Sequence, residues 1–152
     1  MSNYATAGLL SARELFAWRS FLRAHTALTR ELDAELLAAH GLPLTSYEVL
    51  LFLADAPGGH MRMSELAESV LLSRSGLTRL VDRLAGCGLV ERTRCTEDAR
   101  GWFAAITPKG REVFEEARRT HLDGVRRLFV ESFSQDELET LGVCLERLAP
   151  AV

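Results

Sequence analysis

Six polar side chains between Ser73 and Arg83 have the types and the spacing of a surface that binds nucleic acid. They are Ser73, Arg74, Ser75, Thr78, Arg79 and Arg83. Arginine presents a fork of donors that matches phosphate oxygens and the edge of guanine, and hydroxyl groups donate to phosphate. Free N–H groups at a helix N-terminus would add to the attraction for phosphate. The chemistry predicted for this segment is therefore binding rather than catalysis.

An amphipathic helix would hold these side chains on one face. Apolar residues recur in the segment at the i, i+3, i+4, i+7 spacing of a buried stripe. They are Leu77, Leu80, Val81 and Leu84. A short helix with Ser64 as N-cap precedes it, so the pair has the pattern of a helix-turn-helix, with Ser73 as the second N-cap. Charged residues on helices usually only face solvent, so the helix alone does not decide between the two interpretations.

Two β-prone segments follow, at 89–95 and 102–107. A polar, turn-forming stretch separates them, which predicts a β-hairpin with a charged tip. Arg92, Arg94 and Arg100 place further positive charge directly after the helix-turn-helix. A helix-turn-helix followed by a two-stranded hairpin is a winged helix, whose wing can insert arginine into a narrow minor groove.

The charge distribution favours a localised site for a polyanion. The whole chain is mildly acidic, with 18 basic and 21 acidic residues among 152. Between Ser73 and Arg100, however, there are six arginines and only four acidic residues. Basic character is therefore concentrated in the segment that contains the proposed reading helix, and indiscriminate binding of polyanions is disfavoured.

The rest of the chain predicts helices. Apolar spacing over 12–39 indicates one long helix that ends at Gly41, and Thr45 with Glu48 has the spacing of a capping box that opens a second helix. Thr107 before a proline predicts an N-cap for a helix that runs to about residue 133. Another capping box, at 134–137, opens the last helix. The predicted order is α-α-α-α-β-β-α-α.

Composition excludes several classes of protein. A chain of 152 residues that is 47% hydrophobic can build a core without disulfides or a structural metal. No apolar run approaches the roughly 18–20 residues of a membrane span, and the three cysteines form no C-x-x-C, so we expect a cytoplasmic protein without a membrane partner. The sequence has no glycine-rich phosphate loop, nucleophile elbow or metal-ligand spacing, so it predicts neither enzyme, cofactor nor metal site.

Two motifs resemble the MarR family of transcription regulators. Residues 72–84 followed by 88–92 are similar to the recognition helix and the first wing strand of that family. Residues 98–101 and 106–110 resemble its acidic-x-arginine wing and its junction between strand and helix. The resemblance covers nearly the whole chain. It implies a homodimeric, winged-helix transcription regulator, usually a repressor.

The resemblance also implies roles for individual residues. Those expected on the recognition helix, in the major groove, are Ser73, Arg74, Ser75, Thr78 and Arg79, with Arg83 on the same polar face. Arg100 matches the arginine of the wing that enters the minor groove, and Asp98 matches the acid that orients it through a charge-assisted hydrogen bond. Replacement of Asp98 is therefore expected to weaken DNA binding, although it removes a negative charge.

In the MarR family the first, fifth and sixth helices build the dimer interface. The sequence supports this, because the first and last two helices carry more large apolar residues than one small lobe could bury, although intrachain packing accounts for part of them. We therefore expect a single domain over 1–152, mainly α with a small β-hairpin wing. Residues 12–40 and 108–148 would form a helical dimerisation lobe, and 45–107 a winged helix-turn-helix lobe that binds double-stranded DNA.

Members of the family often bind a small aromatic acid between the two lobes. Suitable side chains for a small aromatic or phenolic effector are Trp18, Arg19, Arg23 and Tyr47, although large aromatics more often belong to the core. The resulting hypothesis is a repressor that such an effector releases from a pseudo-palindromic operator.

Two alternatives stay open on the sequence. A winged helix used for protein–protein interaction would bind its partner without salt dependence and would tolerate Arg100→Ala. A redox-sensing regulator would need a reactive thiol, and Cys95 next to Arg94 is the candidate, because a neighbouring cation lowers the pKa of a thiol. Cys87 follows a helix C-terminus, which disfavours a thiolate, and Cys144 lies on a mostly apolar helix.

Overall fold

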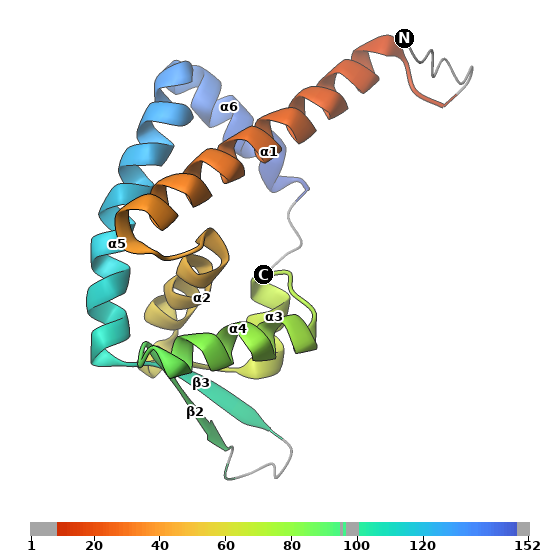
Figure 1. Cartoon of the computed structure of the whole chain (residues 1–152). Helices are drawn as coiled ribbons and strands as arrows, with labels where there is room; N and C mark the ends of the chain where they lie inside the picture. Colours follow the sequence, from red (N-terminus) through yellow and green to blue (C-terminus); the bar gives the residue numbers. More distant parts are fainter. Residues whose placement is uncertain (1–8, 95, 97–100, 149–152) are drawn as a thin grey trace.

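The computed structural model describes residues 9–94, 96 and 101–148, and it confirms a mainly helical fold with a small antiparallel wing (Figure 1). The elements are α1 (Ala12–His40), α2 (Leu44–Asp55), β1 (His60–Arg62), α3 (Met63–Ser69), α4 (Arg74–Gly86), β2 (Val90–Arg94), β3 (Trp102–Ile106), α5 (Pro108–Leu128) and α6 (Gln135–Glu146). Short 3-10 turns lie at Pro57–Gly59 and Val130–Ser132. Helix α1 crosses α5, and its N-terminal half projects away from the rest of the chain.

Capping groups set the ends of α1. Ser11 and Glu14 form a capping box, in which the Glu14 carboxylate accepts from the Ser11 N–H at 2.6 Å and the Ser11 hydroxyl accepts from the Glu14 N–H at 3.3 Å. These hydrogen bonds lower the pKa of Glu14. At the other end Gly41 adopts φ +62°, which confirms the left-handed C-cap.

Two predicted N-caps are wrong. Helix α2 begins at Leu44 after Pro43, without a side-chain cap from Thr45, and the Leu44 N–H instead donates to the Asp33 carboxylate of α1 at 2.8 Å. Helix α3 begins at Met63, and Ser64 lies inside its first turn. Neither hydroxyl therefore caps its helix. The crossing helix α1 provides the acceptor at the start of α2, and α3 continues directly from β1. The caps at Ser73, Thr107 and Ser134 are confirmed.

A third strand, β1, completes the sheet and was not predicted. Strand β3 lies in the middle, antiparallel to β1 on one side and to β2 on the other. Met61 pairs with Ala104, and Arg92 pairs with the same residue from the opposite side. A strand of three residues is too short to show period-two alternation, so the sheet has a strand that the sequence pattern did not indicate.

A single apolar cluster joins α4 to the rest of the fold. The predicted stripe of α4 is buried, and it packs with buried side chains of α1, α2, α3, α5 and the sheet. Leu36 of α1, Leu50 of α2 and Leu66 of α3 are completely buried in this cluster. Because one face of α4 is fixed in the core, its opposite face points outward in a defined direction.

The turn between α3 and α4 contains a strained leucine. Leu71 adopts φ +55° and is 89% exposed, so its side chain gains little from packing while its backbone lies in the left-handed region. Asparagine tolerates this conformation, and we expect Leu71→Asn to stabilise the fold by about 1 kcal/mol, or about 2–4 °C in melting temperature. The exposed Leu37 lies on α1, and Leu37→Asn serves as control, with no gain expected. An unchanged or lower melting temperature for Leu71→Asn would contradict the strain.

Candidate nucleic-acid interface

Helix α4 presents the predicted polar side chains on one outward face. The Ser73 hydroxyl caps the helix by accepting from the Gly76 N–H at 3.1 Å, and it lies 3.3 Å from the Ser75 hydroxyl. Thr78 donates to the Arg74 carbonyl at 2.9 Å and is half-buried. The exposed members of the set are Ser73, Arg74, Ser75, Arg79 and Arg83. The structure therefore brings all six predicted residues of this segment together.

Arg92 ties the wing to α4, and this corrects one expectation. Its Nη1 lies 2.7 Å from Asp82 Oδ1 of α4, and its guanidinium lies 4.8 Å from the centre of the Trp102 ring. The side chain is only 26% exposed. Arg92 therefore does not offer an additional positive charge to a polyanion, because Asp82 neutralises it. Its role is to hold β2 and β3 against α4 through an ion pair and a cation–π contact.

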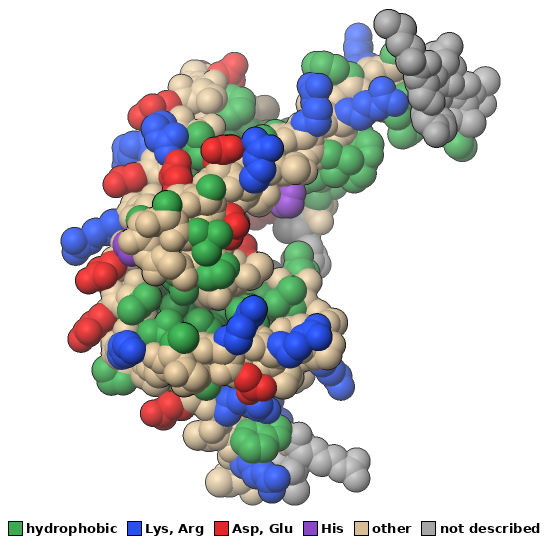
Figure 2. All heavy atoms as spheres, in the orientation of Figure 1, with side chains coloured by type: hydrophobic (Ala, Val, Ile, Leu, Met, Phe, Trp, Pro, Cys, Tyr) green, Lys and Arg blue, Asp and Glu red, His purple; other side chains and the backbone are tan. Residues whose placement is uncertain are grey.

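Besides Arg92, the described part of the wing carries one exposed arginine, Arg94, and one exposed acidic residue, Glu91. The Arg94 guanidinium also lies over the Trp102 ring, at 5.2 Å, and its side chain stays exposed. Figure 2 shows basic side chains over α4 and the wing and also along the projecting part of α1, whereas acidic side chains lie mainly over α5. Asp98, Arg100 and Cys95 lie outside the described residues.

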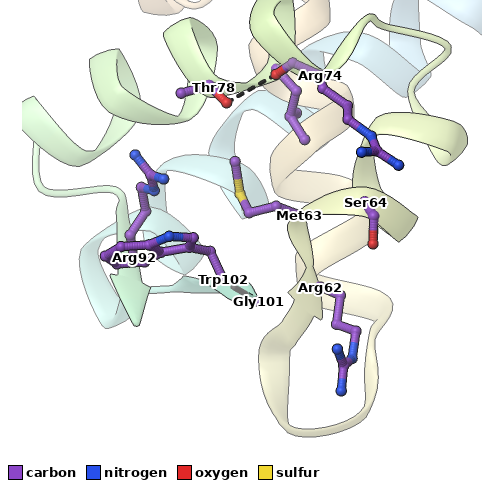
Figure 3. Close-up of a pocket in the computed structure, with 9 residues that line it drawn as sticks. Arg62, Met63, Ser64, Arg74, Thr78, Arg92, Gly101 and Trp102 are labelled. Carbon is purple, nitrogen blue, oxygen red and sulfur yellow. Dashed lines mark hydrogen bonds between the residues drawn. The ribbon is translucent and has the colours of Figure 1, made fainter. Parts of the chain in front are cut away.

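A pocket of about 330 Å³ lies between α3, α4 and the wing (Figure 3). It is lined by Arg62, Met63, Ser64, Arg74, Leu77, Thr78, Arg92, Gly101 and Trp102. Arg74 and Ser64 contribute a guanidinium group and a hydroxyl group to this lining, and none of its described residues is a carboxylate, so the pocket suits an anion. Sequence reasoning missed Arg62 and Ser64, because β1 was not predicted and Ser64 was interpreted as a helix cap.

Of the four residues suggested for an effector, Tyr47 lies apart from the other three. Tyr47 is 3% exposed, and its ring stacks on Phe114 at 5.6 Å and lies 4.6 Å from the ring of His121, so it packs in the core. Burial raises the pKa of its hydroxyl. Trp18 is 54% exposed, and Arg19 and Arg23 are exposed on the projecting half of α1.

His121 predicts a loss of stability in mild acid. Burial lowers the pKa of His121. The unfolded chain therefore binds a proton on this side chain near pH 6.5, whereas the folded chain binds it only at lower pH. Stability is therefore present above about pH 6.5 and is lost as the pH falls toward the lowered pKa. Denaturant melts between about pH 7.5 and 5.5 measure this slope, and His121→Phe, which keeps a ring against Tyr47, should flatten it. An equal slope in His121→Phe would assign the loss of stability to other groups. Glu48 is not among them, because burial raises its pKa and protonation of Glu48 therefore stabilises the folded chain as the pH falls.

The described residues include no cluster of three or more histidine, cysteine or acidic side chains that could hold a metal ion. Cys87 and Cys144 are exposed free thiols. Within the same residues no single helix is long and apolar enough to cross a membrane, although α1 and α2, which are bent by 83° relative to each other, are together long and apolar enough by length and composition alone. The apolar side chains of α2 lie in the core described above.

The order of helices, the buried stripe of α4 and the hairpin after it define a winged helix-turn-helix protein. A sequence model of the MarR family matches residues 40–101. The crystal structure of AbsC, a MarR family transcriptional regulator from Streptomyces coelicolor, is 33% identical over 93% of this chain and 95% of its own, with a TM-score of 0.86. Sco3205, from the same organism and solved in complex with DNA, is 34% identical over 95% and 90% of the two chains, with a TM-score of 0.88.

A curated relative agrees with the solved structures. The transcriptional repressor YetL of Bacillus subtilis is 29% identical over 74% of this chain and 69% of its own. The chain therefore belongs to the MarR family of transcriptional regulators.

Proposed function

We propose that the chain is a sequence-specific transcription regulator that binds a pseudo-palindromic operator as a homodimer. The observation that carries this proposal is the outward face of α4, where arginines and hydroxyls are exposed together beside a wing that Asp82 and Arg92 hold in place. A helix so presented fits the major groove, and Sco3205, a relative of the same fold, was solved with DNA.

The exposed side chains divide by position. Ser73 and Ser75 lie at the N-terminus of α4, where hydroxyls and free N–H groups would contact phosphate. Arg74, Thr78 and Arg79 follow along the same face and would reach base edges or the backbone. The pocket beside Arg74 would seat a backbone phosphate, because the Arg74 guanidinium and the Ser64 hydroxyl line it and would donate to phosphate oxygens. Arg83 would contact phosphate, and Arg100, oriented by Asp98, would enter the minor groove.

Unpartnered apolar surface supports the homodimer. Helix α6 contains no buried residue, and large hydrophobic side chains are exposed on α1, α5 and α6. They include Phe16, Trp18, Phe21, Leu22, Leu122 and Val143. Figure 2 shows hydrophobic side chains along the projecting part of α1. A two-fold partner would cover this surface, so 12–40 and 108–148 would form the dimerisation lobe and 45–107 the DNA-binding lobe of one domain.

An effector would act between these lobes. Trp18, Arg19 and Arg23 provide an aromatic surface and two guanidinium groups on the projecting half of α1, which suits a small aromatic or phenolic acid. Tyr47 would act from within the core rather than by direct contact. The regulator would then be a repressor, released when the ligand changes the distance between the two reading helices.

Selection of duplexes from a random DNA pool tests the operator. We expect enrichment of a two-fold symmetric site with half-sites about one helical turn apart, bound with a steep salt dependence. Titration of the selected duplex at two salt concentrations should show weaker binding and a flatter slope for Arg100→Ala. Failure to enrich a symmetric site, with weak binding that Arg100→Ala leaves unchanged, would contradict the proposal and favour a protein-interaction module.

Substitution of one exposed apolar residue tests the homodimer. Val143, on α6, is 51% exposed, and Val143→Asp would bury two unpaired charges in the interface. We expect the dimer dissociation constant to rise at least about tenfold, measured by light scattering across a concentration series. Leu71→Asp, on the turn between α3 and α4, is the matched control and should stay dimeric. A dimer unaffected by Val143→Asp would contradict this interface.

A further inference from the structure

Helix α4 ends in a C-cap whose backbone hydrogen bonds are made within the cap. Three carbonyl groups that follow this cap need partners from elsewhere in the chain. Leu89 N–H donates to the Leu84 carbonyl at 2.9 Å, and Gly88 adopts φ +75°. This is the hydrogen-bond pattern of a helix that ends in a left-handed residue. The carbonyl groups of Cys87, Gly88 and Leu89 come after that closure.

The N-cap residue and the second residue of α5 satisfy all three carbonyl groups. Lys109 Nζ donates to the Cys87 carbonyl at 2.8 Å. The Thr107 hydroxyl donates to the Gly88 carbonyl at 2.6 Å, and the Thr107 N–H donates to the Leu89 carbonyl at 3.1 Å. The end of the reading helix is therefore bonded directly to the start of α5.

Lys109 is placed against the preference of its own helix. It is the second residue of α5, where the positive end of the helix dipole disfavours a cation, and the first turn of α5 has no acidic residue to offset it. It is also the only lysine among 18 basic residues of the chain. The ammonium group instead meets a carbonyl beyond the C-terminus of α4, where a cation is favoured. Lys109 thus contradicts the charge preference at the N-terminus of its own helix and forms a contact between two helices instead.

Helix α5 connects this junction to the opposite end of the molecule. It packs against α1 and α2, and Arg127 near its C-terminus forms an ion pair with Glu35 of α1. Thr120 in its middle bonds the His40 ring at 2.7 Å. A displacement of α5 relative to its neighbours would therefore reach α4 through the bonds at 107–109.

We propose that Lys109 is a positioning residue that fixes the direction of α4 relative to α5, so that the placement of α5 sets the distance between the two reading helices of the dimer. This inference rests on the proposed function. Thr107 is also the N-cap of α5 and cannot be changed without loss of the helix end, since its hydroxyl accepts from the Gly110 N–H at 2.9 Å. Lys109 is exposed, so its bond can be removed without opening the core.

The readout is the preference of the protein for one spacing between half-sites. A side chain that only stabilised the fold would not change this preference. Wild type, Lys109→Met and Lys109→Arg are titrated with the selected symmetric duplex and with the same duplex carrying one additional base pair between its half-sites. We expect Lys109→Met to weaken binding to the selected duplex roughly two- to fivefold and to reduce the discrimination between the two spacings. Lys109→Arg keeps a donor and should restore discrimination. Arg119→Met removes one exposed charge from the same helix and should behave as wild type.

Amide hydrogen exchange of the protein without DNA tests the junction independently of the operator. Lys109→Met should speed exchange in the segment 84–89 roughly two- to fivefold and leave the centres of α1 and α2 unchanged. Unchanged exchange there, or equal weakening of both duplexes with a flatter salt dependence, would overturn the proposal, the second because Lys109 would then be a phosphate contact. Failure of the wild type to bind any symmetric duplex would overturn the proposed function instead, and the exchange result would still decide whether Lys109 holds the junction.

Discussion

Gly110→Ala is expected to cost about 3 kcal/mol or more of folding free energy, because the new methyl group would collide with the backbone. A Cβ at this position would lie 2.0 Å from the Leu89 carbonyl oxygen and 2.9 Å from its carbon. Neither atom belongs to a flexible side chain, so the start of α5 and the start of β2 must move apart. That movement would break the bonds from Thr107 and Lys109 described above.

Thermal melts measure this cost directly. For a chain of this size, about 3 kcal/mol corresponds to a decrease of about 6–12 °C in melting temperature. Gly86→Ala, at the end of α4, is the matched control, because a Cβ there meets no atom within 4 Å. It should leave stability unchanged or raise it by up to about 1 kcal/mol, since alanine is the better helix former. Similar melting temperatures for the two variants would contradict the close approach of α5 to β2.

Local signals in the sequence were sufficient to predict most of the secondary structure of the DNA-binding lobe. The buried stripe of α4 follows from helical spacing alone, and the caps at Ser73 and Thr107 follow from a hydroxyl placed directly before a periodic segment. The hairpin follows from two β-prone segments around a polar turn. Each of these features is decided by interactions within about four residues, which a single sequence displays.

Contacts between distant residues could not be predicted in this way. Arg92 was expected to add positive charge to the surface, yet it pairs with Asp82 of α4, because the wing folds back onto α4. The Leu44 N–H is capped by Asp33 from another helix, which made the hydroxyl of Thr45 unnecessary. Lys109 did carry a local signal, namely a cation at the wrong end of a helix, and that conflict indicates a tertiary partner.

The wing contacts also explain why total charge is a poor guide to this surface. Arg92 is neutralised by Asp82, so the charge offered outward comes mainly from Arg74, Arg79 and Arg83 of α4 together with Arg94. An ion pair of this kind contributes only about 0–1 kcal/mol to stability when it is near the surface. Its consequence is geometric, because it fixes the angle between the wing and the reading helix.

Arg79→Ala is expected to weaken binding to the selected operator about 10- to 100-fold without changing the fold. The side chain is exposed on α4, so its removal leaves the core intact, while a base contact by arginine contributes about 1–3 kcal/mol. If Arg79 reads a base, the loss should disappear for duplexes changed at one position of each half-site. Arg83→Ala, assigned to phosphate, should instead weaken all duplexes alike and flatten the salt dependence.

Binding titrations at two salt concentrations, with a matched set of point-substituted duplexes, distinguish these outcomes. Arg119→Ala on α5 removes an equal charge far along the chain from α4 and should retain wild-type affinity. Wild-type affinity for Arg79→Ala would contradict the assignment of α4 as the reading helix. A uniform loss, equal to that of Arg83→Ala on every duplex, would show that both arginines contact phosphate, and sequence would then be read by Arg74, Thr78 or the wing.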